Sequence, residues 1–263
     1  MRLQNGSRAA ALLALALLGC GSSGGSPAAV SACEAVLFED TPFTHCLADP
    51  VRHRIFTALD APDGDPARSL EVLADILPEP GKVAFAMNGG MYDEAGEPIG
   101  YYVEDGERRH TLNRNEGGGN FHLLPNGVFY GTGSEWHVRT TEDFAENVTQ
   151  RPEFATQSGP MLVIDGELHP AFDADGDSRK TRNAVGIDRA GRAHVVISEA
   201  PVSFGKLARY FRDRLETPNA LFLDGSVSQL WDPARERIDG GAELGPLIVV
   251  ENRAKAPVER RGP

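Results

Sequence analysis

Four stretches of the sequence place amide, hydroxyl or carboxylate side chains beside short apolar runs. They read AFAMNGGMYD (84–93), EGGGNFHL (116–123), ATQSGPMLV (155–163) and LFLDGSVSQLW (221–231). Amides and hydroxyls donate and accept hydrogen bonds, and adjacent glycines let a ligand reach the backbone, which suits a sugar better than an apolar ligand. Each stretch alone is also explained by a capped turn. The residues predicted to contact such a ligand are Asn88, Gly89, Gly90, Asn120, Gln157, Ser158, Gly159, Ser226 and Ser228.

One of these stretches ends a buried run in an aspartate. The apolar residues 220–223 stop at Asp224-Gly225-Ser226. Asp-Gly is a common hairpin turn, so Asp224 either only turns the chain or is presented from a strand end. Ser226 and Ser228 are not needed for a hairpin, and their presence favours an aspartate that is presented to a ligand.

The elements that must position these side chains are mostly short strands. Apolar or alternating runs predict strands over 51–59, 83–87 and 183–198, the last as a pair. Asp105-Gly106, Asp165-Gly166 and residues 125–127 are predicted hairpin turns. We therefore expect an α+β fold, a single domain of mixed, mainly antiparallel sheet with a few flanking helices.

Two segments have the signature of helices. In the first, Asp65 can cap, Pro66 suits the first helical position, and Pro78 ends the segment. In the second, Ser203 caps a run with apolar residues at 204, 207, 208, 211 and 215, which lie on one helical face. Both helices can therefore cover a sheet.

The length of the chain indicates how many domains it holds, and its charge argues against one class of partner. The chain has 263 residues, enough for one large domain, and a formal net charge of −12. An acidic chain repels phosphate backbones, so we expect no nucleic-acid partner.

The N-terminus has the form of an export signal. Residues 1–19 combine two arginines with a short apolar run that ends in LLGC, which resembles a bacterial lipobox with Cys20 as the lipidated residue. An ordinary signal peptide with an incidental cysteine is the alternative. We expect a flexible tether over 20–32, a domain over 33–252 and a disordered tail over 253–263. The membrane would then be a partner only through the N-terminal lipid, with the domain in the periplasm or outside.

The cysteine count agrees with export. Of the three cysteines, Cys33 and Cys46 remain as a pair if Cys20 carries lipid. A disulfide between them is predicted, because two free thiols are less common outside the cytoplasm.

The sequence lacks the motifs of several familiar catalytic and binding sites. The sequence has no His-Glu-x-x-His, Gly-x-Ser-x-Gly or Walker phosphate loop. The acidic run 173–178 has its glycine at the fourth position, where an EF-hand needs it at the sixth. We predict no metal site, and the sequence requires no cofactor.

Taken in order, five blocks of the chain resemble the phosphodiester glycosidase family, most closely its small bacterial members. They lie within 86–107, 112–129, 154–170, 182–198 and 218–231. The resemblance covers residues 33 to 250 and implies a mixed α+β fold and hydrolysis of sugar-1-phosphodiesters. The chain departs from the family pattern at Met91, Asn183 and Ser226, where members often have an aromatic residue, Thr and Gly.

The resemblance also suggests roles. Cleavage of a glycosidic bond develops oxocarbenium character, which a carboxylate stabilises. Asp224 is the first candidate for base or nucleophile, with Glu104 and Asp93 in reserve. A phosphate leaving group needs a cation more than an acid, and Arg182 can bind it bidentately, although a surface salt bridge is an equal alternative.

Two other functions remain open at this stage. A non-catalytic glycan-binding envelope lipoprotein would share the polar strand ends. A metal-dependent phosphodiesterase would attack phosphorus, but it needs an acidic metal cluster that the motifs do not supply.

Overall fold

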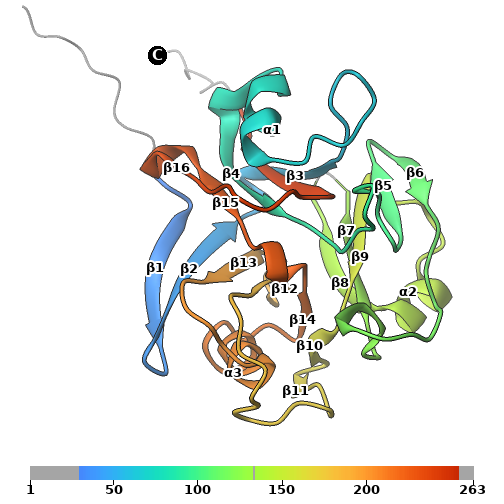
Figure 1. Cartoon of the computed structure of the whole chain (residues 1–263), viewed down its shortest axis with the longest axis vertical. Helices are drawn as coiled ribbons and strands as arrows, with labels where there is room; N and C mark the ends of the chain where they lie inside the picture. The colour runs from blue at the N-terminus through green and yellow to red at the C-terminus, as the bar shows by residue number, and fades with distance from the viewer. Residues whose placement is uncertain (1–29, 133, 255–263) are drawn as a thin grey trace, which may run out of the picture.

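The computed structural model describes residues 30–132 and 134–254 (Figure 1). The predicted signal peptide, Cys20 and most of the predicted C-terminal tail lie outside the described residues. Within these residues, no helix has the length and apolar character needed to cross a membrane.

The described strands form three sheets in which every pairing is antiparallel. The first has the order β1-β2-β13-β12-β14-β10-β11, with β1 (Cys33–Phe38), β2 (Thr41–Ala48), β10 (Met161–Ile164), β11 (Glu167–Leu168), β12 (Asn183–Ile187), β13 (Ala193–Ser198) and β14 (Asn219–Phe222). The second has the order β16-β15-β4-β17-β3, with β3 (His53–Ala58), β4 (Val83–Asn88), β15 (Leu230–Asp232), β16 (Arg237–Ile238) and β17 (Leu247–Asn252). The third has the order β6-β5-β9-β7-β8, with β5 (Tyr102–Glu104), β6 (Glu107–His110), β7 (Gly127–Gly131), β8 (Trp136–Thr140) and β9 (Phe154–Ser158).

One hydrophobic core lies between the three sheets. It gathers side chains from all of them, such as Val185 of β12, Phe85 of β4 and Phe129 of β7. Burial of such a side chain contributes about 1.5–3 kcal/mol. The single-domain α+β fold predicted from the sequence is therefore confirmed.

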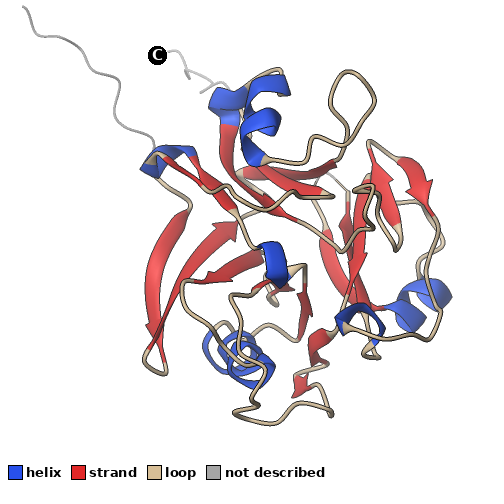
Figure 2. Ribbon diagram, in the orientation of Figure 1, coloured by secondary structure: helices blue, strands red, loops and turns tan. Residues whose placement is uncertain are grey.

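Each sheet also packs against one α-helix on its other face (Figure 2). The helices are α1 (Leu70–Ile76) on the second sheet, α2 (Thr141–Asn147) on the third and α3 (Phe204–Arg209) on the first. Short turns of helix complete the chain: η1 (Pro80–Lys82), η2 (Asn120–His122), η3 (Tyr210–Arg214), η4 (Gly225–Val227) and η5 (Pro233–Arg235).

The first predicted helix begins later than expected. Ser69 caps α1 by accepting a hydrogen bond from the N–H of Val72 at 3.1 Å. Pro66 instead pairs with Asp60 in an isolated bridge, so the predicted cap at Asp65 is wrong. This bridge folds the loop over 60–66 back on itself, so these residues do not extend the helix. The second helix begins at Ser203 as predicted and continues as the π-helical turn η3.

The predicted hairpin at 125–127 is also wrong. Residues 120–122 form the turn η2, so Asn120 begins a 3-10 turn. Asn126 is buried, and its side chain joins Phe121 to Thr141. Its Nδ2 donates to the carbonyl of Phe121 at 2.9 Å, and its Oδ1 accepts from Oγ1 of Thr141 at 2.7 Å. These contacts explain why the segment leads into β7 without a tight turn.

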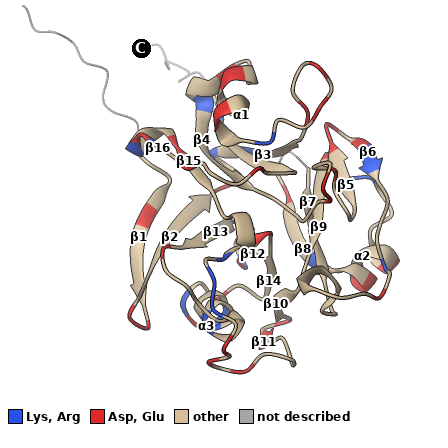
Figure 3. Ribbon diagram, in the orientation of Figure 1, with Lys and Arg blue, Asp and Glu red and all other residues tan. Residues whose placement is uncertain are grey.

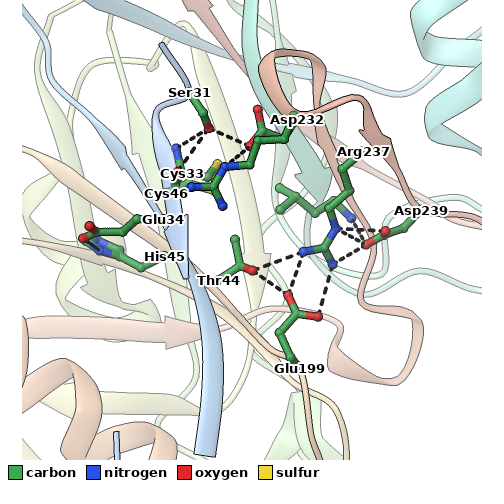
Figure 4. Close-up of a disulfide and its surroundings, with 12 residues drawn as sticks. Ser31, Cys33, Glu34, Thr44, His45, Cys46, Glu199, Asp232, Arg237 and Asp239 are labelled. Atoms are coloured by element: carbon green, nitrogen blue, oxygen red, sulfur yellow. Dashed lines mark hydrogen bonds and ion pairs between the residues drawn. A yellow bond between two sulfur atoms is a disulfide. The ribbon is translucent and has the colours of Figure 1, made fainter. Parts of the chain in front are cut away.

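The predicted disulfide joins Cys33 to Cys46 across the first two strands, where the two residues are register partners (Figure 4). It closes a loop of 13 residues. Beside it, Ser31 donates a hydrogen bond to the buried Asp232 at 2.6 Å, which ties the start of the domain to the second sheet. The link therefore fixes an edge of the first sheet.

We expect removal of this disulfide to destabilise the domain by about 3 kcal/mol, because a loop of this length loses that much closure entropy when it is cross-linked in the unfolded state. Guanidinium unfolding of Cys33→Ala/Cys46→Ala should show the loss. Reductant should lower the stability of the native protein and leave the double variant unchanged. A difference below about 1 kcal/mol would contradict the role given to the link.

Candidate active site

Strand ends from all three sheets meet at residues 88–90, directly after β4. The N–H of Gly89 donates to the carbonyl of Pro246, 2.7 Å away, in the loop before β17. The N–H of Gly90 donates to Oγ1 of Thr156 on β9, at 3.0 Å. A Cβ on Gly90 would collide with the backbone of β9, so this close approach requires glycine.

Asn88 joins this junction to the first sheet. Its side chain is 1% exposed, and Nδ2 donates to the carbonyl oxygen of Asp224 at 2.7 Å. Its Oδ1 accepts from Nδ2 of Asn183 at 2.9 Å and from the N–H of Gln229 at 3.0 Å. The N–H of Asp224 in turn donates to the carbonyl of Gly89 at 3.1 Å. The amide of Asn88 therefore fixes the backbone that carries Asp224.

Asp224 follows the buried strand β14 and the fully buried Leu223, and it precedes η4. Burial raises the pKa of the Asp224 carboxyl, and a hydrogen bond from the N–H of Ser226 opposes the rise. Ser228 closes the turn by donating its hydroxyl to the carbonyl of Gly225 at 2.8 Å. The turn thus holds a carboxylate at a strand end.

Arg182 precedes β12 and is 1% exposed. Its Nε donates to the carbonyl of Val202 at 3.0 Å, and Nη2 donates to the carbonyl and hydroxyl of Ser178 at 2.9 and 3.1 Å. The guanidinium lies over the Phe204 ring at 3.6 Å, with the Phe222 ring at 5.4 Å. No carboxylate in the described parts of the chain pairs with it, and burial lowers its pKa to about 10.

These two charged residues flank the end of the pairing between β12 and β14. The register ends with Ala184 opposite Phe222, the N–H of Leu223 still donates to the carbonyl of Asn183 at 3.2 Å, and Asp224 then turns to Gly89. A Cβ on Gly225 would lie 3.0 Å from the Cα of Arg182, which shows how close the two backbones run. The basic segment that leads into β12 runs beside α3 (Figure 3).

Gln157 ends β9 with all of its hydrogen-bonding capacity in use. Its Oε1 accepts from the N–H groups of Tyr101 and Asn113 at 2.8 and 2.9 Å. Its Nε2 donates to the carbonyl of Asn113 at 2.7 Å and to Oγ1 of Thr141 at 3.0 Å. Contact between this amide and a sugar stays a prediction, and it would require one of these bonds to break.

The neighbouring polar residues have more capacity to spare. The hydroxyl of Ser158 is buried without a hydrogen-bond partner in the described residues. Asn120 is half-buried, and its side chain forms no hydrogen bond within residues 30–132 and 134–254. Gly159 packs against Asn126 and the carbonyl oxygens of residues 120 and 121. Asn120 therefore lies beside the Gln157 block, as the sequence implied.

The two reserve carboxylates are engaged elsewhere. Glu104 accepts a hydrogen bond from the hydroxyl of Tyr102 at 2.7 Å and lines a cavity of about 320 Å³ with Asp60. Burial raises the pKa of the Glu104 carboxyl. Asp93 accepts from the N–H groups of residues 95 and 97 at 2.9 and 3.1 Å and so closes its own turn.

A tyrosine that the sequence analysis did not select lies near Asp224. Burial, followed by the charge of Asp224, raises the pKa of Tyr92. Its hydroxyl donates to the carbonyl of Glu243, whose carboxylate accepts from Arg68 at 2.8 Å. Tyr92 stands in the AFAMNGGMYD stretch and could have been selected. Arg68 and Glu243 come from distant loops that carry no motif.

The described residues contain no group of three or more His, Cys, Asp or Glu side chains placed to hold a metal ion.

Comparison with known proteins gives the family. Residues 81–251 match the family model described as phosphodiester glycosidase. The chain belongs to the phosphodiester glycosidase family. The match spans the strand ends from Asn88 to Asp224, so the junction lies inside the shared domain.

A relative and two solved structures are also similar to this chain. The uncharacterized protein YigE of Escherichia coli (strain K12) is 38% identical over 160 residues, which are 61% of this chain and 62% of YigE. The zebrafish N-acetylglucosamine-1-phosphodiester alpha-N-acetylglucosaminidase catalytic domain, auto-inhibited by its pro-peptide, has a TM-score of 0.57 at 15% identity, over 84% of this chain and 82% of that one. A Synechocystis protein has a TM-score of 0.53 at 16% identity, over 84% and 61%. These structures show a shared fold.

We expect Asn88→Ala to destabilise the protein by about 3 kcal/mol or more, because it leaves buried partners from two sheets without a hydrogen bond. Asn120→Ala is the matched control, and should change stability by less than about 0.5 kcal/mol. Chemical denaturation of both variants makes the comparison. Equal stability of the two variants would show that Asn88 does not hold the junction.

Proposed function

We propose that this protein hydrolyses a sugar-1-phosphodiester, or a related glycosidic bond, in the bacterial cell envelope. The observation that carries the proposal is the end of the β12–β14 pairing, where Arg182 precedes one strand and Asp224 follows the other. Family membership supports glycosidase chemistry. A carboxylate and a guanidinium that acted on one substrate would match the two charges that develop when a sugar separates from a phosphate.

Asp224 would stabilise the positive character of the sugar. Cleavage builds an oxocarbenium-like centre, and a carboxylate within reach acts as nucleophile, base or electrostatic partner. Partial burial strengthens this interaction, because the local dielectric is below that of water. The same burial raises the pKa of Asp224, so the ionised form is held at a cost in folding free energy.

Arg182 would hold the phosphate. A buried cation without an anionic partner is unfavourable, and the phosphate oxygens of a substrate would supply the missing charge. Nε of Arg182 is bound by Val202, Nη2 is bound by Ser178, and the Phe204 ring covers the face of the guanidinium. Nη1 has no hydrogen-bond partner in the described residues. Nη1 is therefore the edge assigned to the substrate.

Further contacts to the substrate are assigned to groups with unused capacity. Asn120, the hydroxyl of Ser158 and the exposed Ser226 fit this role best. Asn88 and Gln157 are assigned to positioning, since their amides are already occupied by protein groups.

The envelope location rests on the N-terminal sequence. LLGC and the Gly/Ser tract after it support a lipid on Cys20 that anchors the domain through a flexible tether.

We expect the Cys20→Ser variant to be lost from the membrane fraction after cell lysis, because the lipid on Cys20 is the anchor that the sequence predicts. Unchanged fractionation of this variant would exclude the anchor.

We expect Asp224→Asn to lower turnover of a sugar-1-phosphodiester by about 100-fold or more, because it removes the stabilising charge. Its melting temperature should stay equal or rise. A raised pKa means that ionised Asp224 weakens the fold at neutral pH, and asparagine removes that charge. Because the pKa of Asp224 is raised, the wild-type protein should lose activity on acidification at a higher pH than it would if Asp224 were an exposed aspartate. Wild-type turnover in this variant would refute the proposal.

The assay measures free sugar and phosphomonoester separately with purified protein. Arg182→Lys is the companion variant, and its defect should be larger on phosphodiesters than on uncharged aryl glycosides, because lysine lacks the planar fork. Binding without turnover across the substrate panel would favour a glycan-binding protein. Release of phosphate with the sugar still attached would favour attack at phosphorus.

A further inference from the structure

A second cavity, of about 370 Å³, opens over the first sheet on the side that carries η3. Its lining includes Glu34 of β1, His45 of β2, His194 of β13, and Tyr210 and Arg214 of η3. Ser198, at the other end of β13, accepts from the N–H of Arg182. Ser198 lies four positions along β13 from His194, a rise of about 13 Å, so the cavity is distinct from the Asp224 junction.

Two stacked histidines form the floor of this cavity. His45 Nε2 lies 3.0 Å from His194 Nδ1, and the rings are nearly parallel at 5°. His194 Nε2 lies 3.1 Å from the carboxylate of Asp188, which also pairs with Arg192 at 2.6 Å. Because a carboxylate only accepts, His194 carries its proton on Nε2 and accepts at Nδ1. His45 must then donate from Nε2, which leaves its Nδ1 as a bare acceptor.

This bare nitrogen faces a second acceptor. Nδ1 of His45 lies 3.5 Å from the Glu34 carboxylate, and no protein donor lies between them in the described residues (Figure 4). Burial lowers the pKa of His45 to about 4 and also lowers that of His194, so both rings are neutral at pH 7. This side of the cavity therefore needs a cationic donor, and an ammonium group satisfies both acceptors.

Two other lining residues, Tyr210 and Arg214, carry donors. Tyr210 is 0% exposed, its ring stacks on Phe43 at 4.8 Å, and its hydroxyl lacks a hydrogen-bond partner in the described residues. Arg214 is exposed and forms no ion pair within them. Burial raises the pKa of Tyr210 to about 12, the charge of Arg214 opposes the rise, and the charge of Glu34 adds to it. η3 is a π-helical turn, a rare element that often occurs at functional sites.

We propose that this cavity binds a small zwitterion whose ammonium and carboxylate lie on one carbon, as in a free α-amino acid. The ammonium would lie beside the Glu34 carboxylate and His45 Nδ1 and donate to both, and the carboxylate would accept from Arg214 and the Tyr210 hydroxyl. The cavity volume falls at the small end of ligand sites, about 300–1,000 Å³. A lining that carries both an acidic and a basic side chain favours such a ligand over a simple anion or cation.

Calorimetric titration of the full chain with glycine and L-alanine tests this proposal. N-acetylglycine lacks the ammonium and glycinamide lacks the carboxylate, so each should bind at least about tenfold more weakly than glycine. Absence of glycine and L-alanine binding, or equal affinity for the single-charge analogues, would overturn the proposal.

Three variants assign the contacts. Glu34→Gln and Arg214→Gln should each weaken glycine binding about tenfold, and Tyr210→Phe, which keeps the stack on Phe43, a few-fold. Arg212→Gln is the matched control, because Arg212 pairs with Asp213 and lies outside this lining, and it should bind as wild type. Equal loss in Arg212→Gln, or none in the other three, would contradict the assignment. Turnover of a sugar-1-phosphodiester by Glu34→Gln should match wild type, which separates this site from the hydrolase.

Discussion

The hydrogen bonds of one buried amide hold the candidate site together. Asn88 stands where β4 ends, and its side chain reaches a carbonyl after β14, the first side chain of β12 and the N–H before β15. Loss of the Asn88 amide would leave several polar groups unpaired, at about 1–3 kcal/mol each. The backbone geometry of Asp224 therefore depends on an uncharged neighbour.

This rigidity makes two unfavourable charges tolerable. Burial opposes ionisation of Asp224, and it removes Arg182 from water without an anionic partner in the described residues. Neither group would keep its position on a mobile loop, because it would turn toward solvent. Fixed carbonyl acceptors, the Phe204 ring and the junction at 88–90 keep them in place, while the central core, three outer helices and a disulfide stabilise the fold around them. Charges held in a low dielectric act strongly on a substrate without reorganisation.

Local signals in the sequence predicted most of the strands. β4, β12 and β14 follow from apolar runs, and the turns at Asp105 and Asp165 follow from Asp-Gly pairs. Errors arose where distant contacts decide the backbone. The loop before α1 is held by the pairing of Asp60 with Pro66, and η2 is held by contacts of the buried Asn126. No local pattern reports such pairings.

The same difference between local signals and distant contacts explains the roles of the amides at the candidate site. Sequence reasoning assigned every amide at a strand end to the ligand, because an amide can both donate and accept. That property also makes an amide the best side chain for joining irregular backbone where sheets meet, and Asn88 and Gln157 are used in this way. What separates a scaffold amide from a ligand amide is its remaining hydrogen-bond capacity, which depends on residues far away in the chain. Asn120, equally polar and next to the same block, begins η2 and keeps that capacity, since its side chain forms no hydrogen bond in the described residues. Residue type therefore locates the junction, and only the three-dimensional count of partners divides its residues between structure and chemistry.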